Sequence, residues 1–213
     1  MFEKKWFCAT FCAVCSIVYP ETLPLPYSTL KEVRPFVDFG FYGNAEPLHE
    51  LIAKHSVKSV IEVGVFIGKS AMDMAAQLPE DGVLYAVDHF LGSVEHQPGQ
   101  GAWHPCQPYL YEQFLSNVIH AKLTHKMIPV RMASLEAARV LETTQPDLIY
   151  IDASHDTESV YKDLCAWFPL VDGRGILCGD DWLWDSVRAA VERFAKEEKL
   201  KIHTADSFWW LEE

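Results

Sequence analysis

The segment "DLIYIDASHDTESVYKDL", residues 147–164, indicates the fold class. Residues 148–151 form a compact apolar run containing β-branched side chains, which is typical of a buried strand. Asp152, His155 and Asp156 follow, and beyond them apolar side chains recur at helical spacing. The segment therefore predicts one strand–loop–helix unit, with titratable chemistry placed where the strand ends.

The same alternation of apolar runs and amphipathic segments continues along the chain, which predicts an α/β fold with a doubly wound, mostly parallel sheet. The last two runs, "KIHTA" and "SFWWLE", are joined by a short turn and predict an antiparallel hairpin at the edge of the sheet. The predicted parallel strands are 58–63, 82–87, 126–131, 147–152 and 175–180, and the predicted helices lie near 45–55, 69–78, 108–121, 134–142, 157–168 and 184–199.

Composition limits the size and the partners of the protein. The chain has 213 residues, 49% of them hydrophobic, which is enough for one domain with a sizeable core. The formal net charge is −12, and no basic run is long enough to follow a phosphate backbone, so we expect no nucleic-acid partner. The irregular stretch 89–108 exceeds the usual connection length and predicts a lid or a binding loop.

The N-terminus favours two opposed interpretations. In residues 1–28, two lysines at positions 4 and 5 precede about a dozen apolar or small residues and a proline, the layout of a secretory signal peptide or an N-terminal anchor. No clear small-residue cleavage signal follows, and an ordinary packed helix is the alternative. We therefore predict a signal-like or anchoring segment over 1–28 and a globular domain over 29–213, with membrane contact only if the segment anchors.

Polar residues gather where the predicted parallel strands end. Ligands in open parallel sheets bind outside these carboxyl ends. Gly64 lacks a side chain where a ligand would approach, although its turn is not the G-x-G-x-x-G dinucleotide fingerprint. Asp88, after the second strand, can accept hydrogen bonds from both hydroxyls of a ribose. A tight corner at Gly64 and a helix cap at Asp88 are the simpler alternatives.

Together these motifs resemble class I S-adenosylmethionine-dependent methyltransferases, and more narrowly the metal-dependent O-methyltransferases of the catechol and macrolide-sugar (macrocin-like) kinds. The resemblance covers residues 45–212. It rests on the E-x-G-x-x-x-G-x-S turn, on the acid after the second strand, and on the strand ends "IDASH" and "GDDW". It implies a Rossmann-like, seven-stranded sheet in the order 3-2-1-4-5-7-6. It also implies that S-adenosylmethionine binds at Glu62, Gly64 and Ser70 (methionine part), Asp88 (ribose) and Ser134 (adenine side).

The resemblance also implies a metal and a base. Asp152, Asp180 and Asp181 match the family's ligands for a divalent cation, and neighbouring strands lie about 4.8 Å apart, close enough for these carboxylates to converge. Oxygen ligands favour Mg²⁺, with Mn²⁺ or Ca²⁺ as alternatives. His155 stands at the position of the family's general base. It would take the proton from a small-molecule hydroxyl acceptor, such as a sugar, a catechol or another metabolite, so that the oxygen attacks the methyl carbon.

Other assignments stay open at this stage. Taken singly, Asp152 could cap the next helix and Asp180 and Asp181 could form a solvated turn. Rival functions are an exported binding module without catalysis and an oxygenase; the strand ends lack the two-histidine, one-carboxylate set of iron oxygenases. S-adenosylmethionine is made in the cytosol, which favours a cytoplasmic protein, whereas the signal-like segment favours export. Whether the protein forms a homo-oligomer is left open. Further candidates for contact with the acceptor are His89, His96, His104, Trp103 and Trp182.

Overall fold

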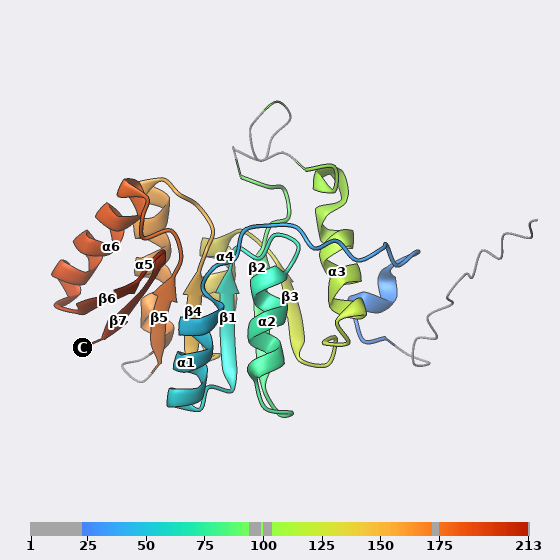
Figure 1. The fold of residues 1–213 in the computed structure, drawn as a ribbon, viewed down its shortest axis with the longest axis horizontal. Helices are drawn as coiled ribbons and strands as arrows, with labels where there is room; N and C mark the ends of the chain where they lie inside the picture. Colours follow the sequence, from blue (N-terminus) through green and yellow to red (C-terminus); the bar gives the residue numbers. More distant parts are fainter. Residues whose placement is uncertain (1–22, 94–98, 100–103, 172–174, 213) are drawn as a thin grey trace, which may run out of the picture.

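The computed structural model describes residues 23–93, 99, 104–171 and 175–212, which form a seven-stranded sheet (Figure 1). The strand order is β3-β2-β1-β4-β5-β7-β6, with β7 antiparallel to both of its neighbours. This confirms the predicted fold class, strand order and edge hairpin. The strands are β1 (Ser59–Val63), β2 (Val83–Asp88), β3 (Met127–Arg131), β4 (Leu148–Ile151), β5 (Ile176–Gly179), β6 (Lys201–Ala205) and β7 (Phe208–Glu212).

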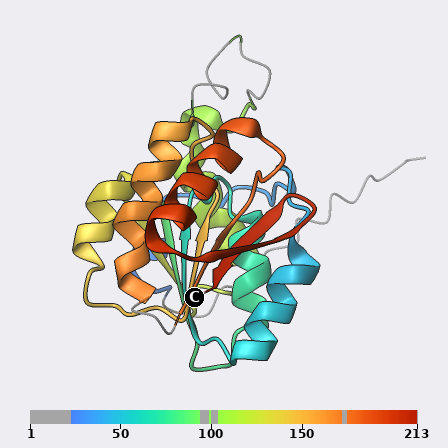
Figure 2. The same cartoon turned by 90° about the vertical axis from the view of Figure 1, so that its left-hand side faces the viewer.

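Helices cover both faces of the sheet, which Figure 2 shows almost edge-on. One hydrophobic cluster takes side chains such as Leu48, Met74 and Phe114 from α1, α2 and α3. A second cluster on the opposite face includes Leu164 and Val191, with further members from α4. The helices are α1 (Ala45–His55), α2 (Lys69–Gln77), α3 (Leu110–His120), α4 (Ser134–Val140), α5 (Thr157–Val171) and α6 (Asp185–Glu198), with 3₁₀ turns η1 (Tyr27–Thr29) and η3 (Gln107–Tyr109).

The central strands explain why their sequences read as unbroken apolar runs. All four residues of β4 and all four of β5 are buried, because helices cover both faces of the sheet. The parallel register pairs Val63 with Ile151 and Ile151 with Gly179. Strands β1, β4 and β5 therefore end level with one another, so the residues that follow them meet at one edge of the sheet.

The segment before α1 packs against the domain. Tyr27 is buried, and its hydroxyl donates to the Met127 carbonyl oxygen at 2.9 Å. The Asn117 side chain of α3 bridges the Val37 backbone, accepting from its N–H at 3.1 Å and donating to its carbonyl at 3.0 Å. Residues 23–44 thus form a strap bound to α3 and β3.

Most of the predicted N-terminal segment 1–28 lies outside the described residues, so a signal or an anchor there stays a prediction. The part that is described, 23–28, contributes Tyr27 to the first hydrophobic cluster. In the described ranges, no helix is both long enough and apolar enough to cross a bilayer.

Candidate active site at the carboxyl edge of the sheet

Gly64 makes the turn after β1 in a conformation that other residues rarely adopt. Its φ is +90°, and a Cβ placed there would lie 2.0 Å from the carbonyl oxygen of Asp152. The loop after β1 therefore crosses directly over the end of β4, and only glycine allows this approach. The β4 backbone occupies the space of a side chain, so the tight-corner alternative explains the glycine, and a ligand contact at Gly64 stays a prediction.

Glu62 and Ser70 form a buried pair behind this loop. The Ser70 hydroxyl at the start of α2 donates to Glu62 Oε1, while Oε2 has no partner among the described residues. Burial raises the pKa of Glu62 well above its usual range; the Ser70 hydrogen bond lowers it, and the charges of Asp152 and Asp88 raise it further. The unpartnered oxygen leaves Glu62 able to accept one more donor.

Asp88 organises the first loop from the end of β2. Its Oδ2 accepts hydrogen bonds from the backbone N–H groups of Val65 at 3.1 Å and Phe66 at 3.0 Å. Its Oδ1 accepts a hydrogen bond from the backbone N–H of Phe90 at 2.6 Å. The contacts with Val65 and Phe66 were not predicted, because they join segments more than twenty residues apart. The carboxylate also lines the cleft described below.

Ser134, at the start of α4, has its hydroxyl engaged by α5. Its Oγ donates to Asp163 Oδ1 at 2.5 Å and accepts from Trp167 Nε1 at 2.9 Å. Burial raises the pKa of Asp163 to about 6, partly offset by the Ser134 hydrogen bond. Ser134 lines the cleft as expected, but its side chain already serves the contact between α4 and α5.

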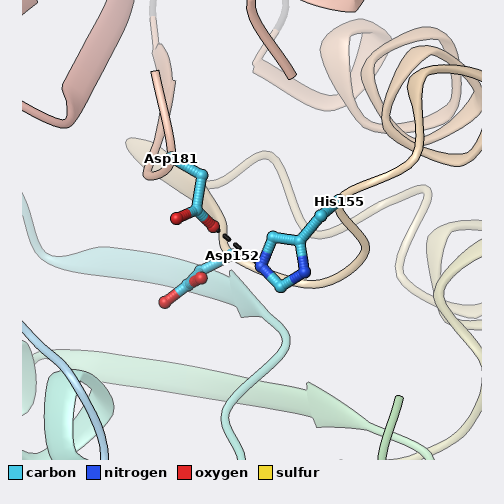
Figure 3. Close-up of side chains that lie close together, drawn as sticks. All are labelled: Asp152, His155 and Asp181. Carbon is cyan, nitrogen blue, oxygen red and sulfur yellow. Dashed lines mark ion pairs between the residues drawn. The ribbon is translucent and has the colours of Figure 1, made fainter. Parts of the chain in front are cut away.

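Asp152, His155 and Asp181 come together at the ends of β4 and β5 (Figure 3). One donor atom from each lies within 4.8 Å of the other two, and His155 Nε2 is 2.9 Å from Asp181 Oδ2. Burial raises the pKa of Asp152 well above its usual range, the charges of Asp180 and Asp181 raise it further, and His155 lowers it. The strand-end residues identified in the sequence are therefore neighbours in space.

Asp180 lies beside this group with a different orientation. Its Oδ1 accepts the Ser207 hydroxyl at 2.5 Å and the backbone N–H of Asp181 at 2.6 Å, which directs that oxygen toward the turn between β6 and β7. Asp180 is buried and also lines the cleft. Ser207 was missed from the sequence, because its role depends on the closing hairpin.

The donor set suits a divalent cation. The group offers carboxylate oxygens and one imidazole nitrogen, and the clustered negative charge makes ionised Asp152 costly without a positive counter-charge. Carboxylates bind Mg²⁺ and Mn²⁺, and an imidazole is compatible with Mn²⁺ and later transition metals.

A cleft of about 1310 Å³ connects these residues. It is lined by the loop after β1, by Asp88, by the start of α4 and by the acidic group. His89 lines it too, whereas His104 stacks on Phe39 with ring centroids 4.1 Å apart. His96 and Trp103 lie outside the described residues. Large apolar side chains that are exposed to solvent also line it, namely Phe39, Phe41, Met132, Leu135, Leu183 and Trp184.

Among the described residues, the tryptophan that lines the cleft is Trp184 and not Trp182, which was singled out from the sequence together with Trp103. Trp182 packs against the second hydrophobic cluster, which leaves packing as its role. Trp184 instead stacks on His155, with ring centroids 4.7 Å apart and an interplanar angle of 24°. Trp184 lies three residues after Asp181 and directly before α6. This position close to the end of β5 could have identified it from the sequence as a residue of the cleft.

Fold and site together define a Rossmann-like domain of the class I methyltransferase type, with a ligand cleft at the carboxyl edge of its sheet. Residues 61–182, more than half of the chain, match the family described as "Methyltransferase domain", and the chain belongs to that family. This confirms the resemblance to methyltransferases that the sequence motifs indicate.

Individual relatives agree with this assignment. A protein of Arabidopsis thaliana named "Putative caffeoyl-CoA O-methyltransferase" is 27% identical over 158 residues, which cover 74% of this chain and 59% of that protein. The O-methyltransferase from Bacillus cereus, solved with SAH, has a TM-score of 0.59 at 15% identity and 80% coverage of both chains. TomG from Streptomyces achromogenes, solved with SAM, has a TM-score of 0.59 at 16% identity, covering 79% of this chain and 78% of that one.

Proposed function

We propose that this protein is an S-adenosylmethionine-dependent O-methyltransferase that acts on a small-molecule hydroxyl, with a divalent cation and with His155 as general base. The observation that carries the proposal is the convergence of Asp152, His155 and Asp181 beside the turn at Gly64, in one cleft. A cofactor site and an acid–base group within one cleft are what methyl transfer to a hydroxyl requires.

The cofactor would lie along the loop after β1. Ser70, which lines the cleft, and the unpartnered oxygen of Glu62 behind it would bind the methionine part, and Gly64 would hold the loop against the end of β4. Asp88 would accept hydrogen bonds from the ribose hydroxyls. The start of α4, at Ser134, would lie beside the adenine. The O-methyltransferases from Bacillus cereus and Streptomyces achromogenes were solved with SAH and SAM, which supports this choice of ligand.

Asp152, Asp180 and Asp181 would hold the cation. When bound, it would supply positive charge that lowers the pKa of a nearby acceptor hydroxyl. His155 would accept the hydroxyl proton, and Asp181 at 2.9 Å would stabilise the imidazolium that forms. The oxygen would attack the methyl carbon as the bond from that carbon to the cofactor sulfur breaks, which releases the demethylated cofactor. The chain's main contribution is to hold acceptor, base and methyl donor in line.

The acceptor would carry apolar surface next to its hydroxyl. Exposed Phe39, Phe41 and Leu183 lie along the cleft, and aromatic faces bind planar or apolar groups well. The name of the Arabidopsis thaliana relative, a caffeoyl-CoA O-methyltransferase, points in the same direction. A homo-oligomer stays a separate proposal, tested by the mass of the protein in solution.

Two measurements test the proposal. Titration calorimetry with S-adenosylmethionine and with its demethylated product should give binding to the wild type and weaker binding to Asp88→Ala. Labelled S-adenosylmethionine, incubated with catechol, sugar and other hydroxyl acceptors, should give a methylated product that disappears on exhaustive chelation. Absence of binding by either ligand would refute the cofactor assignment, and transfer that survives chelation would refute the cation.

A further inference from the structure

Trp184 covers one face of the His155 imidazole. The two rings are stacked at 4.7 Å between centroids with 24° between their planes. Trp184 is 53% exposed and belongs to neither of the two hydrophobic clusters formed by the described residues. A core-packing role therefore does not explain a large aromatic side chain at this place.

Two backbone hydrogen bonds hold the main chain of Trp184 in place. Its N–H donates to the Asp181 carbonyl at 2.8 Å, and its own carbonyl accepts the N–H of Arg188 in the first turn of α6 at 2.9 Å. The indole is thus carried by a tight turn on one side and a helix on the other.

A reciprocal pair of hydrogen bonds joins this turn to the loop that carries His155. The Ser186 hydroxyl donates to the His155 carbonyl at 2.5 Å, and the Thr157 hydroxyl donates to the Ser186 carbonyl at 3.0 Å. Because the two segments are tied in both directions, the indole and the imidazole keep a fixed relation.

An imidazole on a loop turns about two side-chain torsions. Asp181 fixes the direction of Nε2 at 2.9 Å, and a flat ring against one face restricts rotation of the imidazole plane. The opposite face and Nδ1 are then presented in one orientation rather than several. The rate of proton transfer to an imidazole depends on how its ring is oriented toward the donor, so fixing the ring affects that rate.

We propose that Trp184 is a positioning residue that sets the plane of the His155 imidazole for proton transfer in the methyl-transfer reaction. The inference rests on the proposed function for its kinetic consequence, while the stacking itself can be measured without any reaction.

The edge hairpin contains a second histidine–tryptophan stack, which serves as a control for the stack of Trp184 on His155. His203 stacks on Trp210 at 5.0 Å and 13°, and His203 Nε2 lies 2.9 Å from Glu212 Oε2. This is a similar stack of imidazole on indole, placed outside the residues that line the cleft, although Trp210 also packs against the first hydrophobic cluster. Trp210→Leu therefore removes a similar stack without touching the candidate site.

The first measurement is the proton NMR shift of the His155 ring, assigned by its loss in His155→Gln. The indole ring current should displace the shift in the wild type, Trp184→Phe should keep part of the displacement, and Trp184→Leu should abolish it. Trp210→Leu should move the His203 signal and leave that of His155 in place. An unchanged His155 signal in Trp184→Leu would overturn the inference whether or not the protein transfers methyl groups.

The second measurement is a double-mutant cycle on methyl transfer. Trp184→Leu should lower kcat by roughly 10- to 100-fold with little change in KM, in line with the usual cost of lost orientation, and Trp184→Phe should recover most of it. In a His155→Ala background, Trp184→Leu should have no further effect. An equal loss in both backgrounds, or a change confined to KM, would instead assign Trp184 to the acceptor. If no acceptor is methylated, the proposed function fails and the NMR result alone decides.

Discussion

At the scale of single residues, the candidate site places a base and several carboxylates within a few ångströms, and substitution can separate their roles. His155 is a candidate base, yet its Nε2 also falls within the group that could hold a metal ion. Asp180 is a candidate ligand, yet one of its oxygens already accepts two hydrogen bonds. A base affects the chemical step alone, whereas a ligand affects cation binding as well.

For His155→Ala we expect methyl transfer slowed by roughly 10² to 10⁴, the usual contribution of a positioned acid–base group, with cofactor and cation binding nearly intact. Asp180→Asn should instead weaken cation binding and activity together. Single-turnover rates and calorimetry on the two variants provide the comparison. Rescue of His155→Ala by excess cation would identify His155 as a ligand, and full activity in that variant would exclude both roles.

Gly64 is a second residue whose role can be isolated. Gly64→Ala should destabilise the fold by about 3 kcal/mol or more, because the new Cβ would lie 2.0 Å from the Asp152 carbonyl oxygen and φ is +90°. Gly40→Ala is the control: φ there is +108°, but the nearest atom to the new Cβ is 3.8 Å away. Denaturant unfolding should show the larger loss at Gly64, and equal losses would mean that backbone strain alone matters.

At the scale of elements, the sequence predicted the strands and helices well because each depends on local patterns. Buried β4 and β5 appear as apolar runs, and α5 begins where helical spacing begins. The contacts of Asp88 with the loop after β1, and of Ser134 with α5, could not be predicted. They are long-range contacts between polar groups, and a single sequence carries no periodic signal for their pairing.

The contact between α4 and α5 has a consequence for stability. The pKa of Asp163 is raised from 3.8 to about 6 in the folded protein, so the folded state binds this proton more tightly than the unfolded chain. The resulting stabilisation is fully present below pH 3.8 and is lost as the pH rises through about 6. At 1.36 kcal/mol per unit, the loss is about 3 kcal/mol.

Asp163→Asn should remove that pH dependence. Relative to the variant, the wild type should lose about 2 kcal/mol of unfolding free energy between pH 4 and pH 7, measured by denaturant titration at each pH. Asp156→Asn is the control, because hydrogen bonds from Ser159 at the start of α5 lower the pKa of Asp156, which gives the opposite sign. If the wild type and Asp163→Asn follow the same pH curve, Asp163 titrates normally.

At the scale of the whole molecule, two segments far apart in sequence build the candidate site, and the closing hairpin completes it. The end of β4 supplies Asp152 and His155, the end of β5 supplies Asp181, and Ser207 between β6 and β7 orients Asp180. The strand order inferred from resemblance placed the first three together correctly. The Ser207 contact and the stack of Trp184 on His155 depend on turn geometry, which the motif does not encode.

Because the acidic group belongs to the folded state alone, a cation that binds there should stabilise the whole domain. At a concentration 100 times its dissociation constant, a bound ion adds about 2.7 kcal/mol, so Mg²⁺ or Mn²⁺ should raise the Tm of the wild type measurably. Asp152→Asn should abolish most of that rise, since Asp152 lies within 4.8 Å of the other donors. Asp206→Asn, which alters an exposed acid in the hairpin turn, should keep it. A Tm that is independent of both ions, or a rise equal in all three proteins, would show that no cation binds at this group.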